Sequence, residues 1–245
     1  MKNRIFQEDG RAFVIAVDHP LTMPSPDLAD IAGVLSAAVD GGADAVLASY
    51  GCLRRFGSLL GSAGRILRAD CGATMLRKPA GPLKLLYGPE DAARVGADAL
   101  ICMGYPGSTL NAATLENVAK TATGAHAAGL LAGAEMLPYG FEKPEGVETR
   151  SVENVAFACR LGAEMGADFI KTEFVGGTRF REVVGSCFAP VLVLGGSRSK
   201  SEPELLAEVA GAMEAGASGV IIGRNIARSG NIAALCRKIS EIVHN

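Results

Sequence analysis

A lysine interrupts an apolar, strand-like run of this chain. Lys171 lies within Phe169-Ile170-Lys171-Thr172-Glu173-Phe174. Burying an unpaired ammonium group is costly, so such a lysine either faces water or is held where its pKa can fall. Lys171 is therefore a candidate nucleophile that forms a Schiff base with a carbonyl. The alternative left open by the pattern is a structural salt bridge with Glu135 or Glu173.

Other polar groups also stand at or near the ends of apolar runs. Asp18 and His19 follow the run that ends at Val17, and Glu135 stands where an apolar residue is expected. Alternation of side chains along a strand places Glu135, Leu137 and Tyr139 on one face. If that face lines the interior, Glu135 can approach Lys171. Asp18, His19, Glu135 and Tyr139 thus join Lys171 as catalytic candidates, with turn capping and structural ion pairing as the alternatives.

Two later apolar runs end in glycine and polar residues that suit an anion. Glycine allows backbone N–H groups to approach an oxyanion closely, and an arginine guanidinium pairs well with phosphate. The candidate phosphate ligands are Gly195, Gly196, Ser197, Gly223 and Arg224. Tight turns beside a surface arginine are the alternative.

The elements that must position these residues recur in a regular order. A helical pattern ends in glycine and a short apolar run begins at 42–46, 96–100, 166–170 and 216–220. Further strands are expected at 13–17, 65–70, 130–136 and 191–194. The clearest helical patterns cover 26–39, 112–128, 152–165, 203–215 and 232–243. The order predicts a single (β/α)8 barrel over residues 1–245, with a doubly wound open sheet as the alternative.

Composition narrows the class of protein. The 245 residues are 49% hydrophobic and only 5% aromatic, which suits an aliphatic barrel covered by helices. A net charge of −2 predicts no binding to nucleic acid or to a membrane surface. The six cysteines show no metal-binding spacing. We expect a cytoplasmic protein with reduced thiols, no metal and no cofactor, acting on small molecules.

With these residues in place, the chain resembles the class I (Schiff-base) aldolases. That superfamily includes archaeal-type fructose-bisphosphate aldolases, 2-amino-3,7-dideoxyheptulosonate synthases and the deoxyribose-phosphate aldolases. The resemblance covers nearly the whole chain and is strongest from Val152 onward, through 160–172, 190–196 and 219–226. It implies that Lys171 forms the imine, that Asp18 acts as acid or base, and that the five residues above bind the substrate phosphate. A homo-oligomer is also expected.

One position departs from the archaeal pattern. Relatives of that branch carry a tyrosine before a Pro-Arg-Gly sequence, where this chain reads Leu137-Pro138-Tyr139-Gly140. Leucine cannot transfer protons, so Tyr139 or Glu135 is left as a substitute. Glu135 is similar to a glutamate in the corresponding strand of tagatose-bisphosphate-type class I aldolases. Those enzymes also carry a Lys-x-Glu sequence, to which Lys171-Thr172-Glu173 is similar.

The leading hypothesis is a metal-independent aldolase that cleaves or forms a carbon–carbon bond in a phosphorylated ketose or keto-sugar through Lys171. A second hypothesis keeps the lysine but transfers a ketol or acyl group, as a transaldolase or thiolase does. The third is a barrel that binds a sugar phosphate without catalysis.

Overall fold

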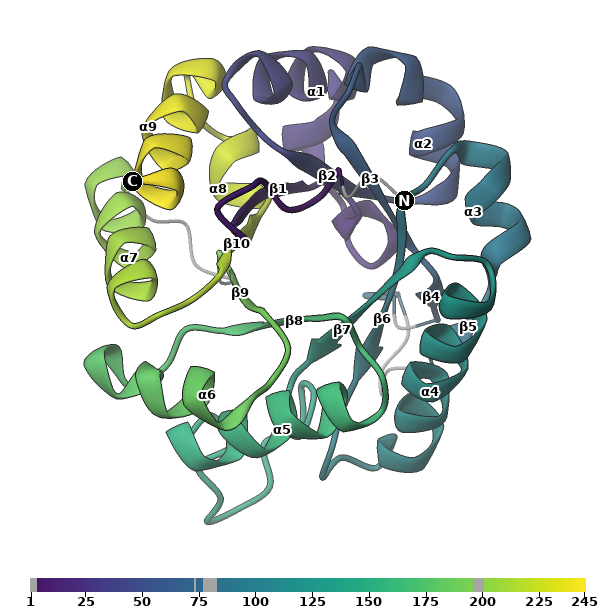
Figure 1. Cartoon of the computed structure of the whole chain (residues 1–245), viewed down its shortest axis with the longest axis vertical. Helices are drawn as coiled ribbons and strands as arrows, with labels where there is room; N and C mark the ends of the chain where they lie inside the picture. The colour runs from purple at the N-terminus through teal and green to yellow at the C-terminus, as the bar shows by residue number, and fades with distance from the viewer. Residues whose placement is uncertain (1–3, 73, 77–82, 196–200) are drawn as a thin grey trace.

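The chain folds into a closed barrel of parallel strands surrounded by helices (Figure 1). This computed structural model describes residues 4–72, 74–76, 83–195 and 201–245. The barrel strands are β1 (Ala12–Ala16), β2 (Ala45–Ala48), β3 (Gly64–Arg68), β6 (Ala99–Gly104), β7 (Leu131–Met136), β8 (Phe169–Glu173), β9 (Val191–Leu194) and β10 (Gly219–Ile222). β1 pairs with both β2 and β10, which closes the sheet. The predicted (β/α)8 barrel is confirmed, and the open sheet is wrong.

Helices form the outer ring seen in Figure 1. They are α1 (Ile31–Asp40), α2 (Tyr50–Phe56), α3 (Pro89–Val95), α4 (Asn111–Ala127), α5 (Val152–Glu164), α6 (Phe180–Ser186), α7 (Glu202–Glu214) and α9 (Ile232–His244). The short helix α8 (Arg224–Ala227) lies inside this ring, next to β10. The short 3-10 helices are η1 (His19–Leu21), η2 (Pro26–Leu28), η3 (Gly57–Leu60) and η4 (Gly177–Arg179). Within the described ranges, no helix is long and apolar enough to cross a membrane.

Two segments differ from the sequence prediction. The helix expected at 26–39 is divided into η2 and α1, because the Asp30 side chain accepts a hydrogen bond from the N–H of Gly33 and starts a new helix there. The strand expected at 65–70 ends at Arg68. The chain then turns into a small antiparallel pair, β4 (Asp70–Cys71) with β5 (Lys84–Leu85). This pair lies outside the barrel sheet.

Toward the N-terminal ends of the strands, the barrel interior is a packed apolar layer. Phe169, Ile66 and Leu192 are fully buried there, and the ring of Phe6 meets that of Phe169 edge to face at 5.9 Å. Gly133 leaves room for this packing, since a Cβ atom at that position would lie 2.4 Å from the Phe169 ring. These side chains fill this part of the barrel interior.

The next inward-facing layer toward the C-terminal ends of the strands is charged. Arg68, Glu135 and Lys171 each lie two residues beyond an inward-facing position of the apolar layer, namely Ile66, Gly133 and Phe169. Side chains along a strand alternate between faces, so all three must point into the barrel. Catalytic residues of such barrels lie at this end of the strands.

Candidate active site

A cavity opens at the C-terminal ends of the strands. Its volume is about 170 Å³. The candidate residues that line it are Asp18, His19, Glu135, Lys171, Gly195, Gly223 and Arg224. Gly196 and Ser197 lie outside the described residues. The structure therefore brings seven of the ten predicted site residues to one cavity.

Lys171 is buried in the wall of this cavity. Its Nζ atom lies 3.0 Å from Oε2 of Glu135, and the two residues are direct partners in the register of β7 and β8. The prediction that Glu135 approaches Lys171 is confirmed. Glu173, the other carboxylate considered for this lysine, lines the cavity but pairs with Arg150. Thr172, which lies between Lys171 and Glu173 in the strand, faces outward and donates a hydrogen bond to the carbonyl of Met136.

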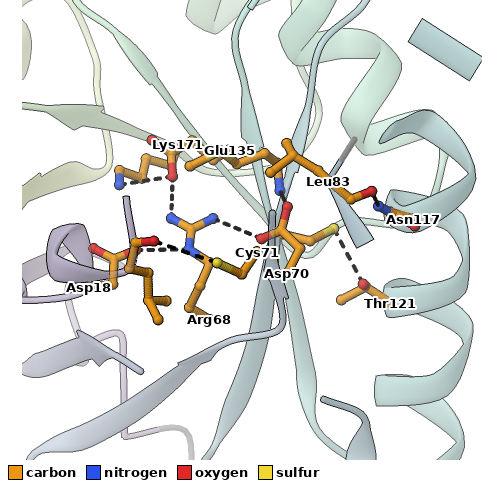
Figure 2. A network of polar contacts seen from close by, with 12 residues as sticks. Asp18, Arg68, Asp70, Cys71, Leu83, Asn117, Thr121, Glu135 and Lys171 are labelled. Atoms are coloured by element: carbon orange, nitrogen blue, oxygen red, sulfur yellow. Dashed lines mark hydrogen bonds and ion pairs between the residues drawn. The ribbon is translucent and has the colours of Figure 1, made fainter. Parts of the chain in front are cut away.

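Arg68 is the centre of the polar network in Figure 2. Its Nε donates to Oδ2 of Asp18 at 2.8 Å, one terminal nitrogen contacts Glu135, and the other lies 3.5 Å from Oδ1 of Asp70. The guanidinium group thus links carboxylates from the ends of β1 and β7 and from β4. Asp18 does not cap the following turn with its side chain, which is engaged by Arg68 instead.

The network holds two carboxylates in the ionised form. Burial alone would raise the pKa of Asp18, but the charges of Arg68 and Lys171 outweigh it and lower that pKa below its usual value. Burial also opposes ionisation of Glu135, and Lys171 and Arg68 again prevail and lower its pKa. The pKa of Arg68 lies well above its ordinary value, because its three carboxylates outweigh the effect of burial. Asp18 and Glu135 are therefore ionised at neutral pH.

Asp70 behaves differently from the other two carboxylates. Burial raises its pKa to about 6, which the charge of Arg68 and a hydrogen bond from the N–H of Met103 only partly oppose. Its Oδ1 and the Nη1 of Arg68 are buried without a hydrogen bond of good geometry. The ion pair at this corner of the network is the weakest of the three around Arg68.

Asp70→Asn is expected to change how stability depends on pH. The pKa of Asp70 is about 6 in the folded protein and 3.8 ordinarily, so the folded state binds this proton more tightly than the unfolded state. The stabilising contribution is present at low pH and is lost as pH rises through 6. Relative to the variant, the wild type should lose about 2 kcal/mol of unfolding free energy between about pH 4.5 and about pH 6.5. Urea unfolding of both proteins at the two pH values measures the difference in their unfolding free energies. The same difference at both pH values would contradict the prediction.

His19 lines the cavity beside Asp18. Its Nε2 lies 3.3 Å from Oδ2 of Asp27 at the start of η2, and both atoms are buried. Burial lowers the pKa of His19 despite the nearby charges of Asp27 and Asp18. The imidazole is thus mainly neutral at neutral pH, and its Nε2 and the facing Asp27 oxygen are buried without a hydrogen bond of good geometry.

The glycines of the expected phosphate site are required by close packing. A Cβ atom on Gly223 would lie 2.1 Å from the carbonyl oxygen of Ala16, and one on Gly195 would lie 2.7 Å from the side chain of Ile222. The side-chain amide of Asn225 donates to the carbonyl of Gly195 at 2.9 Å and joins the ends of β9 and β10. Arg224 lines the same part of the cavity.

The prediction that Tyr139 shares a face with Glu135 is wrong. β7 ends at Met136, and Tyr139 has a left-handed backbone conformation with φ of 60°. The alternation of a strand no longer applies there. The Tyr139 ring lies against Gly107 of the loop after β6, and this residue is not part of the cavity lining. Leu137 does line the cavity, as an apolar residue.

Two residues at the centre of the polar network, Arg68 and Asp70, are not among the candidates predicted from the sequence. Arg68 and Asp70 interrupt the apolar run Ile66-Leu67-Arg68-Ala69-Asp70, which is the same signal that identifies Lys171. Asp27 gives no such signal, because an acidic residue at the start of a helix is common. Among the described residues, no group of three or more His, Cys, Asp or Glu side chains has the arrangement of a metal site.

The comparisons with known proteins agree with this geometry. The profile of the DeoC/LacD family aldolases matches residues 9–229. A 2-amino-3,7-dideoxy-D-threo-hept-6-ulosonate synthase from Halobacterium salinarum is 33% identical over 99% of this chain and 90% of its own length. A class 1 fructose-bisphosphate aldolase from Thermoproteus tenax is 30% identical over 98% of this chain and 92% of its own length.

Solved structures give the same result. An archaeal fructose-1,6-bisphosphate aldolase, with its catalytic lysine covalently bound to the carbinolamine intermediate of the substrate, has a TM-score of 0.89. It is 28% identical, and the match covers 99% of this chain and 97% of that chain. A Schiff-base-forming fructose-1,6-bisphosphate aldolase has a TM-score of 0.88 at 29% identity, covering 98% and 97% of the two chains. The chain therefore belongs to the DeoC/LacD family of aldolases and is an aldolase of the Schiff-base-forming class I type.

Proposed function

We propose that this aldolase cleaves or forms a carbon–carbon bond in a phosphorylated ketose or keto-sugar, with Lys171 as the imine-forming residue. The observation that carries the proposal is the single cavity shared by the buried amine of Lys171, the ionised carboxylates Asp18 and Glu135, and the glycine and arginine groups of Gly223 and Arg224. These are a nucleophile, two proton acceptors and an anion-binding end. The names of the relatives, which include fructose-bisphosphate aldolase, support a phosphorylated substrate.

The first stage of the proposed reaction joins the substrate to the enzyme. The amine of Lys171 adds to the ketone carbonyl, and loss of water leaves a protonated imine. Lys171 must give up a proton before it attacks, and Glu135 is 3.0 Å away to exchange it. A phosphate held near Gly223 and Arg224 fixes the ketone carbon relative to the amine. This positioning lowers the entropic cost of bringing the two reacting atoms together.

The second stage breaks the carbon–carbon bond. A carboxylate takes the proton from the hydroxyl group on the carbon that leaves, and the bonding electrons pass to the protonated imine. The products are a free aldehyde and an enamine on Lys171. The enamine carbon then takes a proton, and water hydrolyses the imine to release the ketone. Asp18 and Glu135 are the proton carriers we propose, with His19 at the cavity wall as a third group within the site.

The proposal is tested by trapping the imine. The protein is incubated with dihydroxyacetone phosphate and reduced with borohydride, then digested and analysed by mass spectrometry. We expect the mass of the reduced ketone to be added to the peptide that contains Lys171. An adduct on a different lysine, or turnover without any trapped adduct, would contradict the assignment.

A further inference from the structure

Apolar side chains line the cavity on both sides of Lys171: Leu21, Met23, Leu194 and Ile222 on the side of Gly195 and Gly223, and a second group on the other side. We call Leu83, Met103, Leu137 and Phe141 the apolar wall; all four line the cavity. Met103 lies on β6, and Leu137 and Phe141 follow β7. In the barrel order, β8 with Lys171 separates β7 from β9 and β10, where the proposed phosphate ligands lie. The apolar wall and the anion-binding end are thus on opposite sides of the lysine.

This wall is built into the fold. Leu83 and Leu137 are buried in a small hydrophobic cluster with Tyr105, and Met103 packs against that cluster. The side-chain amide of Asn117 on α4 donates to the Leu83 carbonyl at 3.1 Å, a contact drawn in Figure 2. The ring of Phe141 meets that of Tyr105 edge to face, with centroids 5.8 Å apart. These contacts fix Leu83, Met103 and Leu137 beside the site, and Phe141 extends the wall as an exposed ring.

The charges of the described cavity lining do not favour an anion at this wall. The cationic side chains of this lining are Arg68, Lys171 and Arg224, and Arg150 lies beside the wall, where it pairs with Glu173 and donates to the carbonyls of Pro138 and Gly140. Arg68 is committed to three carboxylates, and Lys171 is the proposed nucleophile. Arg224 lies after β10, on the side of the phosphate ligands. A phosphate placed against leucine and methionine would lose hydration, and the described cation beside this wall, Arg150, is already paired with Glu173 and two carbonyls, so this position is unfavourable for an anion.

We propose, on the basis of the proposed function, that the apolar wall binds the aldehyde half of the substrate and selects an aldehyde with a short uncharged, apolar chain. The substrate class is therefore a ketose or keto compound with one phosphate, on the ketone half. In the direction of synthesis, the enamine carbon on Lys171 bonds to the aldehyde carbon and the aldehyde oxygen takes a proton. The remainder of the aldehyde lies against Leu137 and its neighbours.

The test compares acceptors in synthesis, with dihydroxyacetone phosphate as the donor. We expect kcat/KM for butanal to exceed that for glyceraldehyde 3-phosphate by at least about tenfold. Phe141→Arg adds a cation at an exposed edge of the wall, and it should reduce this ratio by about tenfold. Phe157→Arg is the matched control, because Phe157 on α5 has a similar exposure, 64% against 73%, and does not line the cavity.

The outcomes separate this inference from the proposed function. A trapped adduct at Lys171 together with a preference for glyceraldehyde 3-phosphate would overturn the inference and leave the proposed function standing. A ratio that Phe141→Arg does not change, or that Phe157→Arg changes equally, would also overturn it. Turnover of dihydroxyacetone phosphate without an adduct at Lys171 would overturn both.

Discussion

Lys171→Met is expected to reduce aldolase activity by about four orders of magnitude or more, because no other group at this position can form the imine. Methionine has a similar length, and Glu135 keeps its contact with Arg68, so the fold should survive. Activity is measured in the cleavage and synthesis directions, and borohydride trapping should give no adduct. Thermal unfolding monitored by circular dichroism should show one cooperative transition, as in the wild type.

The matched control for this variant is Lys120→Met. Lys120 lies on α4, is largely exposed and forms a surface ion pair with Glu116 in the preceding turn of the helix, a type of pair that contributes little to stability. Its replacement should leave both activity and trapping unchanged. Substantial turnover by Lys171→Met would rule out imine catalysis at this residue.

The second large effect is expected at Arg68. Arg68→Met removes the shared partner of three buried carboxylates and should lower the unfolding free energy by about 3–5 kcal/mol. Arg68→Lys keeps one positive charge but loses the planar fork, so it should fold and bind fewer of the carboxylates. Without the full guanidinium, the pKa values of Asp18 and Glu135 rise toward those set by burial. The acid limb of the kcat profile should then move to higher pH in Arg68→Lys.

Urea unfolding and the pH dependence of kcat measure these two effects. Arg94→Met serves as the control, because Arg94 is an exposed arginine on α3 that pairs within its own helix. It should change stability by less than about 1 kcal/mol and leave the pH profile in place. If the acid limb of Arg68→Lys coincides with that of the wild type, Arg68 has a structural role alone and does not set the ionisation of the site.

Much of the fold follows from local signals in the sequence. Glycine at the ends of helices and the aliphatic runs after them mark the barrel strands, because buried parallel strands are apolar on both faces. Gly166 before Phe169–Glu173 is one example: its φ of 95° requires a residue without a side chain. The β4 and β5 pair could not be predicted, since strands of two residues carry no periodicity.

The site is predictable where a charged residue interrupts a strand and less so elsewhere. Lys171 and Glu135 stand in regular strands, so alternation places them in the interior correctly. Tyr139 lies three residues beyond the end of β7, where a left-handed turn redirects the chain. The pairing of Arg68 with three carboxylates depends on the geometry of a closed barrel, which joins segments 50 and 67 residues apart in sequence.

The charges around Arg68 also bear on the course of the proposed reaction. Arg68 and Lys171 are cations, and Asp18, Asp70 and Glu135 are their carboxylate partners. A lysine ammonium and a protonated imine carry the same charge. When bond cleavage neutralises the imine, the proton from the substrate hydroxyl neutralises a carboxylate in the same step. With the substrate bound, the total charge of these groups therefore stays constant from imine formation through bond cleavage, and these steps need no counterion to enter or leave the buried site.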